Sequence, residues 1–354
     1  MTDRIKALRS SLSKNLLDGY LVSNEINMLY LSGAVGTTAL WIPLEGENLL
    51  YVYSTNYESV KATAKNCQVE RMKRSEDPYK KVAEKIKGLR LKRIGFDTLN
   101  ATSYLATKKA LKGTQIKPMG KLVQDLRSIK TPAELASIKK AAEITDAGVK
   151  AALEMIKPGV REYEVAAEIE YAMRKRGSEG TAFDTIVASG TDSAFPHGGC
   201  TDKRIQRSKF IVIDVGARYN NYRADLTRTY IVGKPKPKQR KMYEVVKEAQ
   251  QRAFDKIKAG VKNRDVDAAA RNVIEKVGFG QYFVHGLGHG VGLEVHEAPT
   301  LNAESKERLK VGNVVTDEPG VYIVGYGGVR IEDTVVVHKS QGERLTKAPY
   351  ELEI

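Results

Sequence analysis

Four carboxylates in or beside apolar, strand-like runs constrain this chain more than any other feature of its sequence. They stand in the second part of the chain, at Asp214, Asp225, Glu318 and Glu332. A carboxylate in a strand core is costly unless it is paired or bound to a cation. A single one is often a structural ion pair, but four of them, accompanied by histidines, favour a shared metal site.

A glycine-rich stretch supplies most of the histidines. The run Phe283-Val-His285-Gly-Leu-Gly-His289-Gly-Val-Gly-Leu-Glu-Val-His296-Glu297 holds three of the five histidines in the chain. Histidine ligates metals or moves protons near neutral pH, and glycine lets a ligand or a neighbouring strand come close. Histidines at spacings of four and seven in such a run are unusual in a packed core. We therefore interpret the stretch as part of a functional site.

Four carboxylates with one or two imidazoles suit two divalent cations that share bridging carboxylates. Mainly oxygen ligands with one nitrogen fit Mn²⁺, Co²⁺ or Zn²⁺ and do not choose among them. A bridged pair of ions lowers the pKa of a bound water and polarises a carbonyl, which together permit amide hydrolysis. The chain lacks a Gly-Lys-Ser/Thr phosphate loop and a Gly-x-Ser-x-Gly elbow, so phosphoryl transfer and serine hydrolase chemistry have no support.

The chain length of 354 residues suggests two domains. Residues 1–126 alternate strand and helix patterns and contain no histidine, which predicts a small α/β domain without catalytic groups. Thr131-Pro132-Ala-Glu134 is typical of a capping box that begins a helix ending near residue 156. Two helices followed by acid-bearing strands then occur twice, which indicates an internal duplication. We predict domains at 1–126 and 127–354.

Two local predictions concern the second domain. The basic, proline-containing segment 234–240 is interpreted as an exposed loop that precedes a helix at 242–259. Residues 328–338 are interpreted as one continuous strand, in which the charged Glu332 interrupts an apolar run.

Composition is that of an ordinary globular protein, with 42% apolar and 29% charged residues. The net charge of +15 admits a nucleic-acid partner. The lysines are spread along helix-like segments and are not interleaved with aromatic residues, so we interpret them as a solvated surface. No apolar run reaches the ~18 residues of a membrane span. The first residues lack a signal-peptide core, and two cysteines make no disulfide framework. A cytoplasmic enzyme is expected.

The chain resembles the pita-bread metallopeptidases, a family that includes Xaa-Pro aminopeptidases, prolidases, methionine aminopeptidases and creatinase. The resemblance is strong after residue 180 and general before residue 126. It implies an α/β N-terminal domain of the creatinase type and an α+β pita-bread domain, with pseudo-twofold αβ halves around a curved antiparallel sheet. The runs that carry it are Phe195-Pro-His197-Gly, Ile213-Asp214-Val-Gly-Ala, Ala224-Asp225-Leu-Thr-Arg-Thr, His285-Gly-Leu-Gly-His289-Gly-Val-Gly, Val295-His296-Glu, Asp317-Glu318-Pro-Gly and Gly328-Val-Arg330-Ile-Glu332-Asp, with Arg127-Ser-Ile-Lys130-Thr-Pro-Ala-Glu-Leu at the domain entry.

The resemblance also implies a metal centre. Five residues match the ligands of two divalent ions: Asp214, Asp225, His289, Glu318 and Glu332. Asp225 and Glu332 would bridge the ions. A hydroxide between the ions would attack the scissile carbonyl, with Glu318 as the proton acceptor.

Four further residues match groups that surround the substrate. His197 and His296 match histidines that orient the substrate and stabilise the tetrahedral intermediate. His285 matches a histidine near the proline side of the pocket. Arg330 also matches this set and would fix a ligand carboxylate.

The resemblance implies hydrolysis of the Xaa-Pro bond at the N-terminus of short proline-containing peptides by a homodimer. A strict Xaa-Pro dipeptidase stays open as an alternative. Prolidases often carry an arginine shortly after the His-Glu pair, and here none follows His296-Glu297 before Arg308. A non-catalytic binding protein on this fold would be expected to have lost ligands, whereas all five positions are filled.

Overall fold

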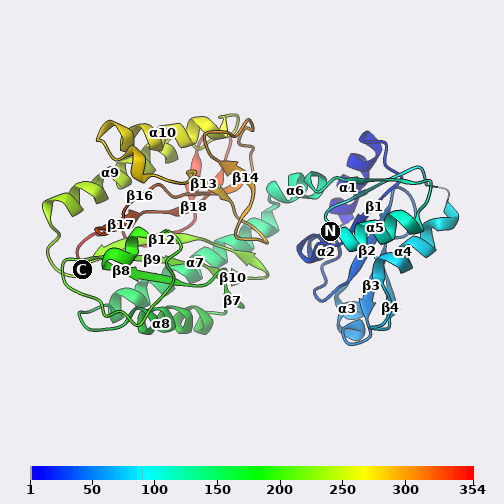
Figure 1. The fold of residues 1–354 in the computed structure, drawn as a ribbon, viewed down its shortest axis with the longest axis horizontal. Helices are drawn as coiled ribbons and strands as arrows, with labels where there is room; N and C mark the ends of the chain where they lie inside the picture. Colours follow the sequence, from blue (N-terminus) through cyan, green and yellow to red (C-terminus); the bar gives the residue numbers. More distant parts are fainter. Residues whose placement is uncertain (1, 90) are drawn as a thin grey trace. The chain divides into compact units, whose positions relative to one another are not determined.

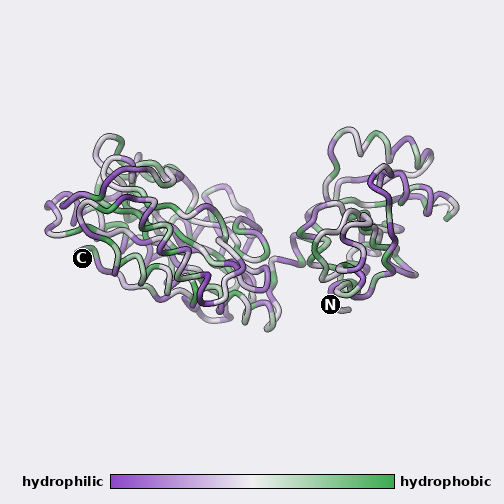
Figure 2. The backbone as a smooth tube through the Cα atoms, turned by 90° about the horizontal axis from the view of Figure 1, so that it is seen from below, coloured by the Kyte–Doolittle hydropathy of each residue, from purple (hydrophilic) through white to green (hydrophobic). Residues whose placement is uncertain are grey.

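The computed structural model describes residues 2–89 and 91–354. These residues form two compact units, Met1–Arg127 (unit 1) and Ser128–Ile354 (unit 2) (Figure 1). Figure 2 shows apolar and polar residues intermixed along both units. No helix among the described residues is long and apolar enough to cross a membrane.

Unit 1 is built on a six-stranded sheet of order β4-β3-β2-β1-β5-β6. The β1-β2 and β2-β3 pairs are antiparallel, and the outer pairs are parallel. Leu21, Trp41 and Ile94 are buried in its core. The strands are β1 (Gly19–Val22), β2 (Ala39–Pro43), β3 (Leu49–Tyr53), β4 (Gln68–Met72), β5 (Arg93–Phe96) and β6 (Gln115–Pro118). The helices are α1 (Thr2–Lys14), α2 (Glu25–Ser32), α3 (Tyr57–Thr63), α4 (Pro78–Ile86) and α5 (Ala101–Ala110), with α6 (Lys121–Ser128) crossing into unit 2.

Several elements of unit 1 carry weak sequence signals. The β-rich runs at residues 39–43 and 48–53, with a turn between them, predict a hairpin, and β2 and β3 form it. The patterns do not predict α2, α6, β4 or β6. The strands β4 (Gln-Val-Glu-Arg-Met) and β6 (Gln-Ile-Lys-Pro) form the two edges of the sheet. Polar, short edge strands avoid pairing with other chains and show little apolar alternation.

Unit 2 contains four long helices: α7 (Pro132–Met155), α8 (Glu162–Lys175), α9 (Pro237–Phe254) and α10 (Asn263–Lys276). The capping box before α7 is confirmed, because the Thr131 side chain accepts from the Glu134 amide at 3.4 Å and Glu134 Oε2 accepts from the Thr131 amide at 2.7 Å. The predicted start and end of α9 are wrong. The helix begins inside the basic segment, at Pro237, and ends at Phe254. Proline is tolerated there because the first backbone N–H groups of a helix have no partner within the helix.

Most strands of unit 2 lie in two main antiparallel sheets, each covered by one helix pair. In Figure 1 the pair α7 and α8 lies on one side of the strands and α9 and α10 on the other. This arrangement confirms the predicted αβ halves. The first sheet has the order β12-β9-β8, with β8 (Ile186–Ser189), β9 (Phe210–Val215) and β12 (Leu226–Ile231). The second has the order β14-β13-β15-β18-β19, with β13 (Gly288–Gly290), β14 (Glu297–Leu301), β15 (Val314–Asp317), β18 (Asp333–Val337) and β19 (Gly342–Arg344).

Smaller elements complete the unit. A hairpin joins β16 (Gly320–Ile323) to β17 (Gly327–Arg330), and β7 (Gly180–Thr181), β10 (Ala217–Tyr219) and β11 (Tyr222–Arg223) form a short sheet. Three 3₁₀ turns occur within residues 2–89 and 91–354: η1 (Lys87–Leu89), η2 (Gly190–Ala194) and η3 (Gly280–Tyr282).

The two main sheets of unit 2, the three-stranded β12-β9-β8 sheet and the five-stranded sheet, meet along a seam formed by residues 225–229 and 330–334. The predicted continuous strand 328–338 is wrong, because it breaks at residues 331–332 into β17 and β18, which belong to different sheets. No ladder among the described strands pairs β12 with β18. Individual bonds join the seam instead: the Thr229 hydroxyl donates to the Arg330 carbonyl at 2.8 Å, and the Glu332 amide donates to the Thr227 carbonyl at 3.0 Å.

The capping box generates a stability prediction. Thr131→Ala removes the side chain that accepts the Glu134 amide and should lower the free energy of unfolding by about 1 kcal/mol. Urea denaturation followed by far-ultraviolet circular dichroism measures the change. Ser137→Ala, on the same helix, removes only a hydroxyl that donates to the Ala133 carbonyl of the preceding turn and should change stability by less than about 0.5 kcal/mol. Equal effects of the two substitutions would contradict the assigned role of the cap.

Candidate metal centre

A cavity of about 540 Å³ in unit 2 brings together every residue singled out from the sequence. Side chains that reach it come from both halves of the unit, so neither half forms the site alone. The charged residues and histidines that line it are His197, Asp214, Asp225, His285, His289, His296, Glu318, Arg330 and Glu332. Phe183, Ile186 and Val284 add an apolar wall, and these three carried no distinguishing signal in the sequence.

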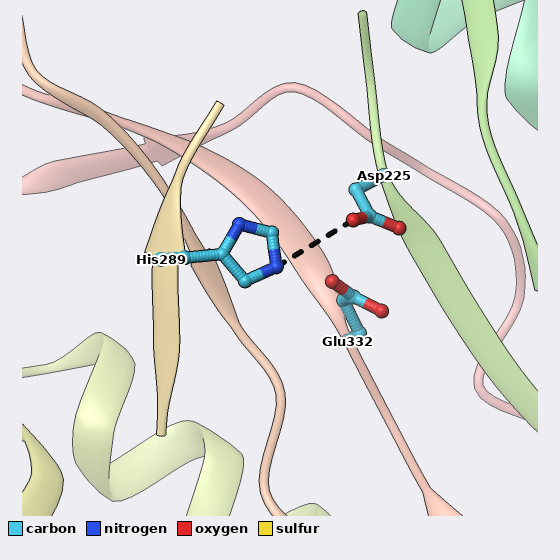
Figure 3. A group of neighbouring side chains, drawn as sticks. All are labelled: Asp225, His289 and Glu332. Atoms are coloured by element: carbon cyan, nitrogen blue, oxygen red, sulfur yellow. Dashed lines mark ion pairs between the residues drawn. The ribbon is translucent and has the colours of Figure 1, made fainter. Parts of the chain in front are cut away.

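Three potential metal ligands converge most closely. Asp225 directly precedes β12, His289 is the middle residue of β13, and Glu332 lies in the break between β17 and β18. One ligand atom from each lies within 4.8 Å of the others, and Figure 3 shows the three side chains turned toward one another. The His289 Nε2 atom is 3.7 Å from Asp225 Oδ2 and 3.1 Å from Glu318 Oε1.

The two remaining carboxylates of the predicted set differ in their surroundings. Asp214 is held by Arg330 through its Oδ2 atom, and Glu318 Oε1 accepts from the Thr316 hydroxyl at 3.0 Å. All five predicted ligands therefore lie in the cavity, while the tightest group of three comprises Asp225, His289 and Glu332.

Two buried carboxylate oxygens fit a cation. Asp214 Oδ1 and Glu332 Oε1 have no hydrogen-bond partner among the described residues. The second oxygen of Glu332 accepts from the Thr227 hydroxyl at 2.6 Å. A buried carboxylate with one oxygen fixed and the other bare is costly without a cation. Carboxylate oxygens with an imidazole nitrogen are a donor set suited to divalent transition metals.

The glycines around His289 allow two strands to approach each other. A Cβ atom on Gly288 would lie 2.3 Å from the Thr316 carbonyl oxygen, and one on Gly290 would lie 2.3 Å from the Ala298 carbonyl oxygen. No side chain fits at these distances, so β13 requires glycine on both sides of its histidine. The predicted close approach in the glycine-rich stretch is therefore between strands.

The two other histidines of that stretch have different environments. The ring of His296 packs edge-on against His289, with ring centroids 4.1 Å apart and an interplanar angle of 87°. The ring of His285 uses both nitrogens within the protein: Nδ1 lies 2.8 Å from the Gly286 carbonyl and Nε2 lies 3.0 Å from Tyr322 Oη. His285 therefore meets the cavity through its ring carbons.

Arg330 is almost fully buried, with 4% of its surface exposed. Its Nε donates to Thr227 Oγ1 at 2.9 Å, its Nη1 to Tyr322 Oη at 3.0 Å and to the Pro196 carbonyl at 3.2 Å, and its Nη2 to Asp214. All three nitrogens are thus engaged by the protein. The guanidinium orients the Asp214 carboxylate and lines the cavity with its remaining surface.

Two supporting residues were missed from the sequence. Tyr322 joins His285 to Arg330 through its hydroxyl, and Lys130 forms a buried ion pair at 2.8 Å with Glu297, the residue after His296. Tyr322 follows the usual apolar pattern of a strand, and Lys130 lies 167 positions from its partner. No local pattern marks either contact.

Burial and mutual repulsion favour the protonated forms of several of the predicted ligands when no cation is bound. Burial raises the pKa of Asp214, Asp225 and Glu332, and repulsion among the carboxylates adds to the shift. Burial alone would lower the pKa of His289, but the hydrogen bond and charge of Glu318 outweigh it and raise that pKa to about 9. Burial would raise the pKa of Glu318, but the bond from His289 lowers it to about 2.

These shifts predict how the metal-free protein responds to pH. The raised carboxyl and His289 pKa values mean that the folded state holds more protons than the unfolded state, so the free energy of unfolding should fall as pH rises from 6 to 9. Cations must displace the same protons, so metal affinity should rise with pH. Thermal unfolding of chelator-treated protein and calorimetric titration in buffers of different ionisation enthalpy measure both effects. A metal-free protein that becomes more stable from pH 6 to pH 9 would contradict these shifts.

Comparison with known proteins places this cavity in a family. Residues 136–339 match Metallopeptidase family M24, and residues 4–129 match the Creatinase/Prolidase N-terminal domain. The chain is 42% identical to the Xaa-Pro dipeptidase of Pyrococcus horikoshii over 354 residues, which cover 99% of both proteins. The structure matches an Xaa-Pro dipeptidase from Bacillus anthracis with a TM-score of 0.94 at 39% identity, covering 100% of this chain and 99% of the other. It matches the X-Pro aminopeptidase from Thermotoga maritima with a TM-score of 0.87 at 35% identity, covering 97% and 99%. The chain belongs to metallopeptidase family M24 and has the pita-bread fold and hydrolase character of that family.

Proposed function

We propose that this protein hydrolyses the Xaa-Pro bond at the N-terminus of short peptides, using two divalent cations. The observation that carries the proposal is the convergence of Asp225, His289 and Glu332 within 4.8 Å, beside bare buried oxygens of Asp214 and Glu332. The printed names of the relatives support specificity for proline.

The ligand roles are those that the family resemblance implies. Asp225 and Glu332 stand on the two sides of the seam and would bridge the cations, His289 and Glu318 would complete one of them, and Asp214 the other. Mn²⁺, Co²⁺ and Zn²⁺ all suit these donors. When bound, such cations polarise the scissile carbonyl and make a water molecule acidic enough to react at neutral pH.

Glu318 is suited to accept the proton of the attacking water. In the metal-free protein the hydrogen bond from His289 lowers its pKa to about 2 despite burial, and a bound cation would keep the carboxylate ionised once His289 becomes a ligand. The Thr316 hydroxyl fixes its Oε1 atom at 3.0 Å. A general base must be both ionised and oriented toward the proton that it removes, and Glu318 meets both conditions.

The histidines and the apolar wall are suited to hold the peptide. Burial and the nearby His289 lower the pKa of His296, so its ring is neutral and can donate one hydrogen bond to oxygen without adding charge. His197 lines the same cavity. The carbon edge of His285, with Phe183 and Val284, offers apolar surface for a proline ring, whose nitrogen has no hydrogen to donate.

The charge of the cavity favours peptides longer than two residues. Among the described residues that line it, Arg330 is the only lysine or arginine, and all its nitrogens are engaged. Thr300 and Asn302, which also line it, are neutral. A dipeptide's terminal carboxylate thus meets no dedicated cation in unit 2. A strict Xaa-Pro dipeptidase is the second candidate, favoured by the printed name of the relative that is 42% identical.

Homodimerisation and a cytoplasmic location belong to the same proposal. The homodimer rests on the family resemblance, and the cytoplasmic location rests on composition. Light scattering of the purified protein measures its molar mass and hence its oligomeric state.

Substrate comparison tests the proposed activity. The metal-free protein should cleave neither Ala-Pro nor Ala-Pro-Ala, and Mn²⁺ or Co²⁺ should restore cleavage before proline, with Ala-Ala-Ala as the control that stays intact. We expect kcat/KM for Ala-Pro-Ala to equal or exceed that for Ala-Pro. Cleavage confined to Ala-Pro would establish the strict dipeptidase, and activity that ignores metal would refute the metal centre.

Substitution of single histidines tests the division of roles. His289→Ala should lower metal stoichiometry or affinity, because it removes a proposed ligand. His296→Ala should retain metal and lower kcat by about 10²- to 10³-fold, the usual effect of losing one donor to a developing oxyanion. His338→Ala is the control. The His338 Nε2 atom lies 2.8 Å from Glu343 Oε2, and neither residue lines the cavity. Equal metal loss in the His289 and His296 variants would refute the division.

A further inference from the structure

We propose that Arg228 is a positioning residue that sets the spacing between Asp225 and Glu332 across the seam, and hence the affinity of the metal centre. Arg228 lies on β12 and is almost fully buried, with 1% of its surface exposed. It does not line the cavity. This inference rests on the proposed metal centre.

The guanidinium of Arg228 makes five hydrogen bonds. Its Nε donates to the Ala348 carbonyl at 3.1 Å, and its Nη2 donates to the same carbonyl at 2.9 Å and to Asp333 Oδ1 at 2.9 Å. Its Nη1 donates to the carbonyls of Thr227 at 3.0 Å and Glu332 at 2.6 Å. Arginine has five N–H donors in a rigid planar group, so these bonds fix the group in one orientation.

The bonds of Arg228 and its neighbour hold Glu332 at three points. The Glu332 carbonyl accepts from Arg228, its amide donates to the Thr227 carbonyl at 3.0 Å, and its Oε2 atom accepts from the Thr227 hydroxyl at 2.6 Å. Two adjacent residues of β12 thereby fix the backbone and one carboxylate oxygen of a residue that lies outside any strand. Only the oxygen Oε1, the candidate metal ligand, is left without a partner among the described residues.

The same network fixes Asp225 from the opposite side. The Thr334 hydroxyl accepts from the Asp225 amide at 3.0 Å and donates to the Asp225 carbonyl at 2.7 Å. The Thr334 amide in turn donates to Thr346 Oγ1 at 3.2 Å, and the Thr346 hydroxyl donates to Asp333 Oδ1 at 2.7 Å. Asp333 is also the acceptor of Arg228, so both proposed bridging ligands are tied to one buried carboxylate.

Residues 346–350 provide the fixed support for this network. The Ala348 carbonyl receives two bonds from Arg228, and the Tyr350 ring lies 4.2 Å from the guanidinium carbon and donates its hydroxyl to Asp333. Asp146 on α7 accepts from the Lys347 and Ala348 amides at 2.8 to 2.9 Å. The support is therefore anchored to a long helix.

Regular strand pairing cannot set the spacing here, because no ladder among the described strands joins β12 to β18. The distance between the bridging carboxylates depends on these side-chain bonds instead. Ligands must be held to within about 0.5 Å of the productive geometry, and loss of a supporting group beyond the ligands typically lowers metal affinity 10- to 100-fold.

Arg228→Lys tests the proposal, because lysine keeps the charge beside Asp333 but cannot make the five bonds. We expect its Mn²⁺ affinity, measured by calorimetric titration of metal-free protein, to fall about 10- to 100-fold. Arg271→Lys is the matched control: Arg271 pairs with Asp267 through two bonds of 2.9 and 3.0 Å and donates to the carbonyls of Phe283 and His285, none of which is a proposed ligand. Both variants should lower the melting temperature of the metal-free protein, but Arg271→Lys should leave Mn²⁺ affinity within about twofold of wild type.

Each outcome decides between the proposal and a purely structural role. Unchanged affinity in Arg228→Lys, or equal losses in both variants, would overturn it. If Arg228→Lys does not fold, Thr346→Val replaces it. This variant removes the hydroxyl that holds Asp333, the carboxylate to which Arg228 is anchored, so Mn²⁺ binding should weaken about two- to tenfold. Unchanged affinity would refute the proposal. A wild-type protein that binds none of Mn²⁺, Co²⁺ and Zn²⁺ would refute the metal centre itself, whereas wild-type binding of Mn²⁺ with unaltered affinity in the variants would refute only the role of Arg228.

Discussion

The repulsion and desolvation of carboxylates confined to one buried cavity is the constraint on which unit 2 depends. Asp214, Asp225, Glu318 and Glu332 meet where water cannot solvate them, and the folded chain offsets this cost in several ways. Arg330 and a protonated His289 supply positive charge, hydroxyl groups fix individual oxygens, and protons bind where no cation does. The centre is costly by itself, and a cation is the partner that its bare oxygens lack.

The residues that line the cavity could be predicted from the sequence because a metal site needs residue types that are rare in a packed core. Carboxylates in apolar runs and histidines among glycines are rare combinations, and all seven residues chosen on this basis line one cavity, together with His197 and Arg330, which the family resemblance implied. The helix-pair and strand pattern likewise predicts two αβ halves. The roles of the individual residues stay predictions, since they depend on bound metal and substrate.

The parts that could not be predicted are those determined by contacts between distant backbone groups. Residues 328–338 read as one strand because the apolar alternation continues across the break at 331–332, where pairing changes from β16 to β15. Arg228 reads as an ordinary strand residue, since three of its acceptors are main-chain carbonyls. Main-chain groups carry no signature of residue type, and strand pairing partners are chosen by tertiary packing.

The adjacent acids Glu332 and Asp333 have a consequence for how such a chain can vary in evolution. One serves the cavity and the other serves the buried network behind it. An insertion or deletion of one residue between β17 and β18 would shift the register by one, so only one of the two places would keep a carboxylate, and that side chain would be one methylene too short or too long. The turn at residues 324–326 of the β16-β17 hairpin bears no such restriction. Homologous chains should therefore differ in length at that hairpin tip and stay invariant in length seven residues later.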